Sequence, residues 1–194
     1  MNLSRRSRSL VVVLVGVALA GCSAAPVASP TPSPTYACVP EAGGEAVPCG
    51  PIEYEQSQRR NALYAEAEAV YRRYWAEKER LASMPDPSWT AELEATTGGA
   101  FRESAMELVD RARGRQRVSG EPQLAWVKRL PGLSRSGSIV ALEVCTDASG
   151  ATYASADGGQ PQPGLTGQLR LYYSRDQDSV LRIVESEAKE VPTC

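Results

Sequence analysis

Five cysteines and no histidine limit the chemistry open to this chain of 194 residues. Without histidine, Ser-His-Asp and Cys-His mechanisms and histidine-ligated zinc sites are excluded. No segment has the glycine spacing of a phosphate-binding loop, and the Asp176-Gln177-Asp178 run lacks the glycine and glutamate of a calcium loop. The sequence therefore predicts no metal and no cofactor. Chemistry must come from cysteines, carboxylates and tyrosines.

Cys22 follows a leader that is typical of exported proteins. Segment 1–8 is basic, and residues 10–19 form an unbroken run of small and apolar residues. That run is too short to cross about 30 Å of hydrocarbon comfortably as a helix. We therefore interpret residues 1–21 as a signal peptide rather than a retained membrane span.

The tetrapeptide Leu19-Ala20-Gly21-Cys22 resembles the lipobox of bacterial lipoproteins. In that family a diacylglyceryl group is attached to the cysteine thiol, and a peptidase cleaves just before the cysteine. The resemblance implies cleavage between Gly21 and Cys22 and a lipid anchor at the extracytoplasmic face of the cell membrane. Two acyl chains suffice for stable anchoring, because each buried methylene contributes about 0.8 kcal/mol.

A proline-rich linker is expected behind the anchor, over residues 22–37. Its four prolines up to Pro34 stand among alanine, serine and threonine, so the segment has little to bury. Such a composition favours an extended, disordered stalk.

The charge of the mature chain argues against nucleic acid as a partner. Removing the three positive charges of Arg5, Arg6 and Arg8 takes the formal net charge from −2 to −5. An acidic domain has no electrostatic attraction to nucleic acid. The arginine run within 111–117 is a local exception: it is either a polyanion site or, more often, a solvated helix end.

With Cys22 assigned to lipid, four cysteines remain for two disulfides. Three pairings are possible. We favour Cys38–Cys49, which closes a glycine- and proline-rich loop over residues 38–50, and Cys145–Cys194, which ties the chain terminus to a strand. The alternative of a four-cysteine metal site lacks any Cys-x-x-Cys spacing.

Three helices are predicted in the first half of the domain. Apolar residues recur at helical spacing from 52 to about 82, which favours one long helix whose first turns project or fray. A second, shorter helix is expected to begin with Asp86 as its N-cap and to end near residue 96. A third runs from 100 to about 113.

After Gly120 the pattern changes to short segments rich in β-branched, leucine and tyrosine residues. These predicted strands cover residues 124–129, 138–146, 152–155, 168–174 and 179–187. In the first of them, Leu124, Trp126 and Lys128 alternate with the residues between them. Turn residues at 147–150 and 174–178 predict hairpins. Helices followed by antiparallel strands predict an α+β domain over residues 51–194, with three helices packed on one strongly curved, cone-like sheet.

This order of elements resembles the cone of nuclear-transport-factor-two-like domains, also called SnoaL-like domains. The run 140–149, the Asp157-Gly158 pair and a last strand ending in cysteine are similar to a pattern of small lipoproteins from actinobacteria and actinophages. The resemblance covers about residues 51–194 and informs the fold more than the activity. Asp147 and Ser149 are best interpreted as turn residues whose side chains cap backbone groups.

The resemblance also suggests where a pocket would lie. Cone-fold enzymes include some that pair an aspartate base with a tyrosine donor. By that likeness, Tyr71 and Tyr74 on the first helix, Asp110 on the third and Trp126 on a strand are candidates to line a cavity. The alternative is that the aromatic side chains belong to the core and Asp110 is solvated.

Our leading hypothesis is a lipid-anchored extracytoplasmic binding or adaptor protein of the cell envelope, without enzymatic activity. Its partner would be an envelope protein or a small apolar ligand in the cone. Likeness to phage lipoproteins adds a further version, in which a prophage encodes the protein to exclude a second infection at the host surface. The alternative is a small cone-fold enzyme that uses an Asp/Tyr acid–base pair.

Overall fold

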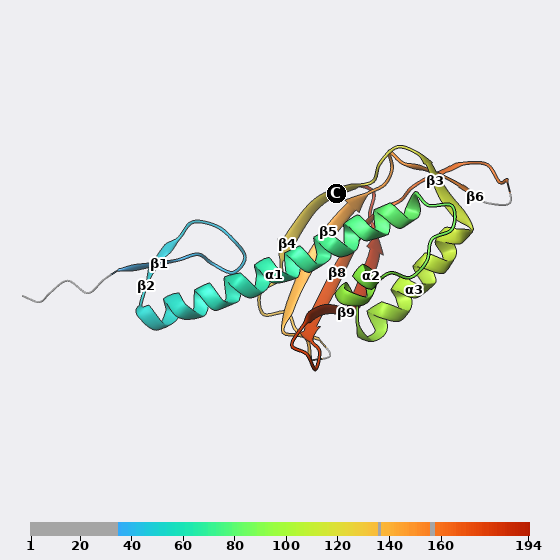
Figure 1. Ribbon diagram of the computed structural model, residues 1–194. Helices are drawn as coiled ribbons and strands as arrows, with labels where there is room; N and C mark the ends of the chain where they lie inside the picture. Colours follow the sequence, from blue (N-terminus) through green and yellow to red (C-terminus); the bar gives the residue numbers. More distant parts are fainter. Residues whose placement is uncertain (1–34, 136, 156–157) are drawn as a thin grey trace, which may run out of the picture. The chain divides into compact units, whose positions relative to one another are not determined.

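In the computed structural model, which describes residues 35–135, 137–155 and 158–194, the longest element is helix α1, Pro51–Ala82 (Figure 1). Pro51 occupies the first helical position, where its missing N–H costs nothing. The Glu53 carboxylate accepts a hydrogen bond from the Gly50 N–H at 2.5 Å, which satisfies one donor at the helix start. The predicted signal peptide and nearly all of the predicted linker lie outside the described residues.

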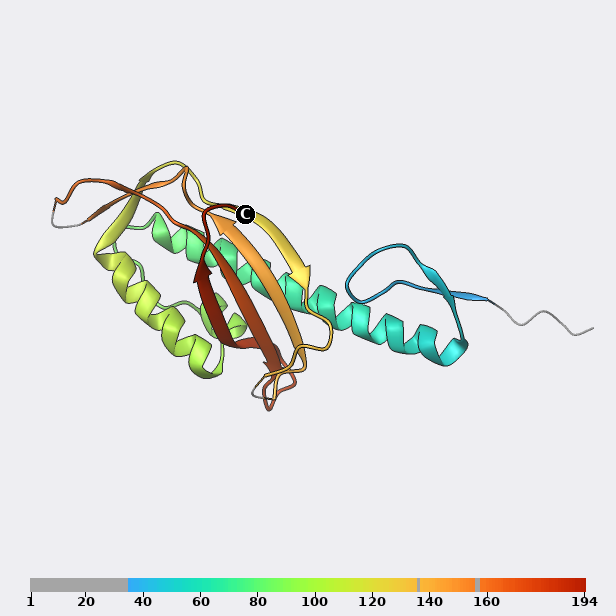
Figure 2. The same ribbon diagram turned by 180° about the vertical axis from the view of Figure 1, so that it is seen from behind.

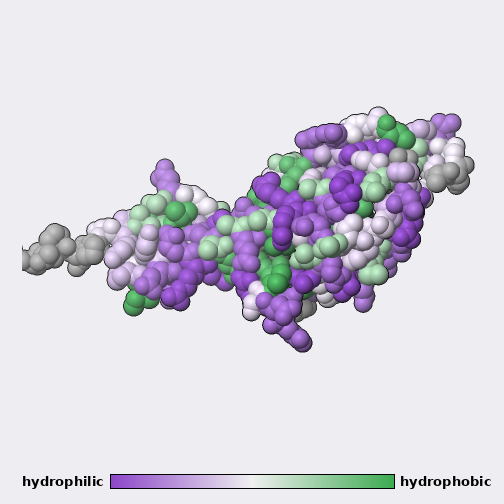
Figure 3. Space-filling model, viewed as in Figure 1, coloured by the Kyte–Doolittle hydropathy of each residue, from purple (hydrophilic) through white to green (hydrophobic). Residues whose placement is uncertain are grey.

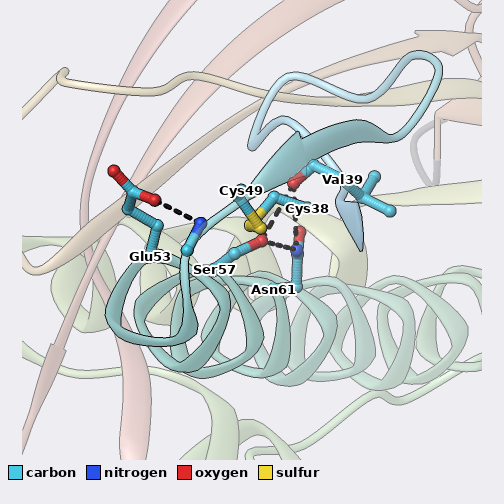
Figure 4. The surroundings of a disulfide bond; sticks show 7 residues. Cys38, Val39, Cys49, Glu53, Ser57 and Asn61 are labelled. Atoms are coloured by element: carbon cyan, nitrogen blue, oxygen red, sulfur yellow. Dashed lines mark hydrogen bonds between the residues drawn. A yellow bond between two sulfur atoms is a disulfide. The ribbon is translucent and has the colours of Figure 1, made fainter. Parts of the chain in front are cut away.

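The N-terminal turns of α1 are covered by a small hairpin instead of the main sheet. Strands β1, Tyr36–Cys38, and β2, Val47–Cys49, pair antiparallel and are joined by the disulfide Cys38–Cys49. The Val39 carbonyl accepts hydrogen bonds from Ser57 Oγ at 3.1 Å and Asn61 Nδ2 at 3.3 Å (Figure 4). The first turns thus extend beyond the core, as expected, but the hairpin packs on them.

Two shorter helices follow, α2, Ala91–Thr96, and α3, Gly99–Arg113. The predicted N-cap of the second helix was wrong. The Oγ1 of Thr90, not the side chain of Asp86, accepts a hydrogen bond from the Leu93 N–H at 3.3 Å. Asp86 instead lies at the surface, 3.8 Å from Arg113.

Four strands form the largest sheet, in the order β4-β5-β8-β9, and every neighbouring pair is antiparallel. They are β4, Gln123–Arg129, β5, Val140–Asp147, β8, Thr166–Arg175, and β9, Leu181–Glu190. Helices α1 and α3 cover one face of this sheet, and no helix of the described residues covers the other face, called here the helix-free face (Figures 1 and 2). The turn between β8 and β9 makes the predicted hairpin at 174–178.

The α+β class is confirmed, but the single curved sheet was wrong, because the described residues form three sheets. Strand β3, Arg115–Ser119, pairs with β6, Thr152–Ser155, which also pairs with β7, Gln162–Pro163. The predicted hairpin at 147–150 was also wrong. That turn connects β5 to a strand of another sheet, because β6 pairs with β3 and β7 and not with β5.

A bulge in β4 decides which side chains face the helices. Leu124 is paired with Thr146 and Trp126 with Cys145, so one extra residue lies between them on β4. Successive side chains in a strand point to opposite faces, and the extra residue shifts that alternation. Leu124 and Val127 therefore both pack against the core, while Trp126 points away from it.

The core lies between α1, α3 and the four-stranded sheet. Its fully buried large side chains include Tyr64, Tyr71, Leu142, Leu171, Tyr173 and Ile183. Burial of each such side chain stabilises the fold by about 1.5–3 kcal/mol relative to leaving it exposed. On the face drawn in Figure 3, hydrophilic residues dominate and apolar residues form only small separate areas.

Candidate functional site

The two tyrosines predicted to line a pocket belong to the packed core. Tyr71 is 0% exposed and Tyr74 is 6% exposed, with ring centroids 6.2 Å apart. The rings of Tyr74 and Phe101 pack in a T-shaped arrangement, with their centroids 5.1 Å apart. Burial raises the pKa of the Tyr71 hydroxyl well above its usual value, with a smaller effect from Tyr74. Both side chains fill space between helix and sheet.

The other two predicted pocket residues lie elsewhere. Trp126 is on the helix-free face of the sheet, where its Nε1 donates to the Cys194 carbonyl at 3.0 Å. Asp110 is 68% exposed and pairs with Arg113 at 2.9 Å. The four side chains do not converge on one cavity, and Asp110 forms no acid–base pair with either tyrosine. The bulge in β4 and the outward face of α3 are the physical reasons.

Both disulfides have the favoured pairing. Cys38–Cys49 closes the hairpin on α1, and Cys145–Cys194 ties the chain terminus to β5 on the helix-free face. The predicted cleavage and lipidation site, Gly21 and Cys22, lies outside the described residues.

A groove of about 410 Å³ is the strongest candidate site. Its lining residues come from the C-terminal turns of α1 and α3, from β6 and from the segments before β6 and β8. Its apolar lining comes from Ala82, Leu108, Ala112, Ala148 and Leu165. Leu165 is 65% exposed, so its side chain is open to a ligand.

The wall of the groove formed by Ala148 depends on a turn fixed by Asp147. The Asp147 Oδ1 accepts hydrogen bonds from the Ser149 N–H and the Thr166 Oγ1, both at 2.9 Å. These hydrogen bonds hold the pKa of Asp147 below its usual value, and those from Ser149 have the larger effect. A Cβ added to Gly164 would lie 2.4 Å from the Ala148 carbonyl oxygen, so only glycine permits this close approach. The predicted turn role of Asp147 is confirmed.

Charged side chains border the apolar lining. Lys78 and Glu79 come from α1, and Arg111 comes from α3. The Lys78 Nζ lies 3.4 Å from the Glu79 carboxylate and 4.0 Å from the centroid of the Trp75 ring. Burial lowers the pKa of Lys78 below its usual value, and the Glu79 carboxylate partly offsets that effect.

Glu79 also binds a second cation. Arg117 Nη1 lies 2.8 Å from the Glu79 Oε2, and Arg117 Nη2 donates to Ser83 Oγ at 2.6 Å. The Arg117 and Glu79 side chains are each 15% exposed, so this is the better shielded of the two ion pairs. Arg111 forms no ion pair with any residue that the structure describes. The groove therefore carries more positive than negative charge.

Two other hollows lack this combination. The larger one, about 780 Å³, lies between the β1–β2 hairpin and α1, and its cation Arg60 is paired with Glu41 at 3.3 Å. A hollow of about 400 Å³ on the helix-free face has mostly charged and amide lining, with Arg170 paired to Glu143 at 3.1 Å. Only the groove, among these three, joins an apolar lining to unbalanced cations.

Sequence reasoning missed the groove residues. The arginine run 111–117 was the one available signal, and the structure divides it between separate roles. Arg111 borders the groove, Arg113 pairs with Asp110, and Arg117 binds Glu79. Nothing in the sequence linked Lys78 to this run.

Within the described residues, no cluster of three or more acidic, cysteine or histidine side chains is placed to bind a metal ion. In the same part of the chain, no helix combines the length and apolar character needed to cross a bilayer. No protein-family model matches the chain, and no curated protein resembles it closely enough to be counted as a match. The assignment of a function therefore rests on the sequence signals and on the geometry of the groove.

Proposed function

We propose that this chain is a lipid-anchored extracytoplasmic protein that binds a small, largely apolar ligand in the groove between α1, α3 and β6. The observation that carries the proposal is the apolar lining of that groove. Its volume of about 410 Å³ falls in the range of about 300–1,000 Å³ that is typical of small-molecule sites.

The anchor is supported by the sequence and by the disulfides. Leu19-Ala20-Gly21-Cys22 follows a basic and then an apolar segment, in the order of a lipoprotein leader. Disulfides persist in oxidising compartments, and the domain contains two. A tether through residues 23–34 would leave the groove accessible to ligands outside the membrane.

Membrane fractionation of cells that make the full precursor tests the anchor. We expect the protein in the membrane fraction, with a mass increase for the diacylglyceryl group on Cys22. Replacing Cys22 with serine should remove the added mass and release the chain, whereas Ser23→Ala should change neither. A Cys22→Ser protein that stays in the membrane fraction would contradict the lipid anchor.

Binding of an uncharged fluorescent probe, N-phenyl-1-naphthylamine, tests the groove. The whole mature chain with Cys22→Ser, exported by a signal peptide without a lipobox, avoids interference from detergent. We expect saturable binding that Leu165→Glu weakens, because the new carboxylate lies among the apolar side chains of the groove. Leu133→Glu, at a leucine that is 38% exposed elsewhere, is the control. Absence of saturable binding would contradict the small-ligand proposal and favour an envelope protein as partner.

The likeness to nuclear-transport-factor-two-like domains is also part of this proposal. It is supported by the antiparallel four-stranded sheet with α1 and α3 on one of its faces. The phage version of the function has a separate test in the genome. Integrase or repressor genes beside the coding gene would support it, and a housekeeping operon would count against it.

A further inference from the structure

We propose that the ligand of the groove is an amphiphilic monocarboxylate, with its carboxylate held by Lys78 and Arg111 and its apolar body against Leu108 and Leu165. This inference rests on the proposed function, because it names the chemical class of the ligand for the same groove. It is carried by the balance of charge around the groove.

This balance of charge follows from the contacts of the Glu79 carboxylate. Glu79 is shared between Lys78 at 3.4 Å and Arg117 at 2.8 Å. A single carboxylate neutralises only one of these two cations, and the shorter contact is with Arg117. Arg111, at the opposite helix, has no ion pair among the described residues. The groove lining therefore has two cations and one carboxylate, and because that carboxylate is shared with Arg117, the lining keeps a net positive charge.

The position of Lys78 makes this excess charge costly in the free protein. Its side chain is only 26% exposed, and it lies between the Trp75 ring and Glu79. A partly buried ammonium without a full counter-charge loses hydration that its neighbours do not replace. An anion in the groove would supply that counter-charge, and a guanidinium can add a second, charge-assisted hydrogen bond.

The lining restricts the rest of the ligand. Between the cations of α1 and α3, the groove offers methyl and methylene groups and the exposed Leu165 side chain. A strongly hydrated polyanion would gain nothing from this surface. A molecule with one carboxylate and a compact apolar chain or ring would satisfy both parts of the site.

Calorimetric titration with octanoate, 1-octanol and octylamine tests the inference. The protein is the complete mature chain with Cys22→Ser. Octanoate and 1-octanol share the apolar chain and differ in the head group. We expect octanoate to bind at least about tenfold more tightly than 1-octanol, since a charged hydrogen bond is worth about that factor. Octylamine should bind more weakly than both.

Two variants identify the cations. Arg111→Gln removes an exposed charge and is not expected to disturb folding, while Lys78→Met keeps the length of the buried stem. Each should reduce the preference for octanoate over 1-octanol and leave the affinity for 1-octanol nearly unchanged. Arg59→Gln, at an exposed arginine paired with Glu55, is the matched control.

The outcomes separate the two proposals. Equal affinity for octanoate and 1-octanol, or a preference unaffected by Arg111→Gln, would overturn the carboxylate inference and leave apolar ligand binding intact. If neither compound nor the fluorescent probe binds, the proposed function itself is wrong. Tighter binding of octanoate that both variants abolish would establish the inference.

Discussion

Tyr172 and Tyr173 are neighbours on β8, and removing their hydroxyl groups should change stability in opposite directions. Tyr173 faces the helices and is 0% exposed, and its hydroxyl has no hydrogen-bond partner among the described residues. Tyr172 faces the other side of the sheet, where its hydroxyl donates to the Glu187 carboxylate at 3.1 Å. Substitution by phenylalanine therefore removes an unfavourable buried hydroxyl at Tyr173 and a hydrogen bond at Tyr172.

The expected magnitudes follow from these surroundings. A buried polar group without a partner costs about 1–3 kcal/mol, so Tyr173→Phe should raise the free energy of unfolding by about 1 kcal/mol. The hydrogen bond of Tyr172 is worth about 0.5–1.5 kcal/mol. Because the Glu187 side chain is 42% exposed, Tyr172→Phe should lower stability by an amount near the smaller end of that range. Burial raises the pKa of Tyr173 well above its usual value, so its hydroxyl stays neutral in any assay near neutral pH.

Urea unfolding followed by far-ultraviolet circular dichroism, with both disulfides intact, measures the difference. We expect midpoints on opposite sides of the wild-type value with an unchanged denaturant slope. Each 1 kcal/mol should appear as about 2–4 °C in a thermal scan of a domain of this size. A loss of more than about 1 kcal/mol in Tyr173→Phe would refute the reasoning, because the hydroxyl would then have a partner. Tyr71→Phe, at the second partnerless buried hydroxyl, should follow Tyr173→Phe.

Three further predictions concern other parts of the domain. Burial raises the pKa of Tyr74 to about 12, whereas the unfolded chain releases this proton near pH 10. Tyr74 should therefore contribute a loss of stability of about 2 kcal/mol as the pH rises from 10 to 12, and Tyr74→Phe should reduce the fall seen in pH-dependent urea unfolding. Gly99 has φ 51° and an added Cβ would lie 2.8 Å from the Val184 carbonyl oxygen, so Gly99→Ala should cost more than about 1 kcal/mol, whereas Gly132→Ala, with φ 73° but open space around it, should cost less in the same assay. Opening the Cys145–Cys194 disulfide through Cys194→Ser should lower stability by about 4 kcal/mol in the loop-entropy account of a 49-residue separation; an unchanged urea midpoint would mean that the bridge adds nothing to the fold.

Local interactions explain what could be predicted of the elements. The long helix was expected over 52–82 and spans Pro51–Ala82, because a 3.6-residue apolar period and a proline at the first position are properties of neighbouring residues. The start of α2 was misplaced, since Asp86-Pro87 is as good a local start signal as Thr90. These two possible helix starts are distinguished only by the hydrogen bond from Trp89 Nε1 to Glu94 and by the packing of α2.

The residues of the candidate site could not be predicted from local sequence patterns. Alternation alone placed Trp126 on the same face as Leu124, but the bulge between them turns Trp126 to the opposite face. Lys78 and Arg111 border one groove although 32 residues separate them in the chain. No periodicity connects residues on α1 with residues on α3, because their approach depends on how both helices pack on the sheet.

By itself, the sequence determined the α+β class and the long helix, which depend on composition and local period. It favoured one of three cysteine pairings, and its leader and lipid anchor stay predictions. The tertiary structure alone decided that the strands divide into three sheets, that Tyr71 and Tyr74 fill the core, and that a cationic, apolar groove forms at the ends of α1 and α3. The physical reason is that strand partners and groove walls are set by contacts between residues far apart in the chain. The free energies of these contacts depend on how well whole elements pack together, and this cannot be predicted from any single segment of the sequence.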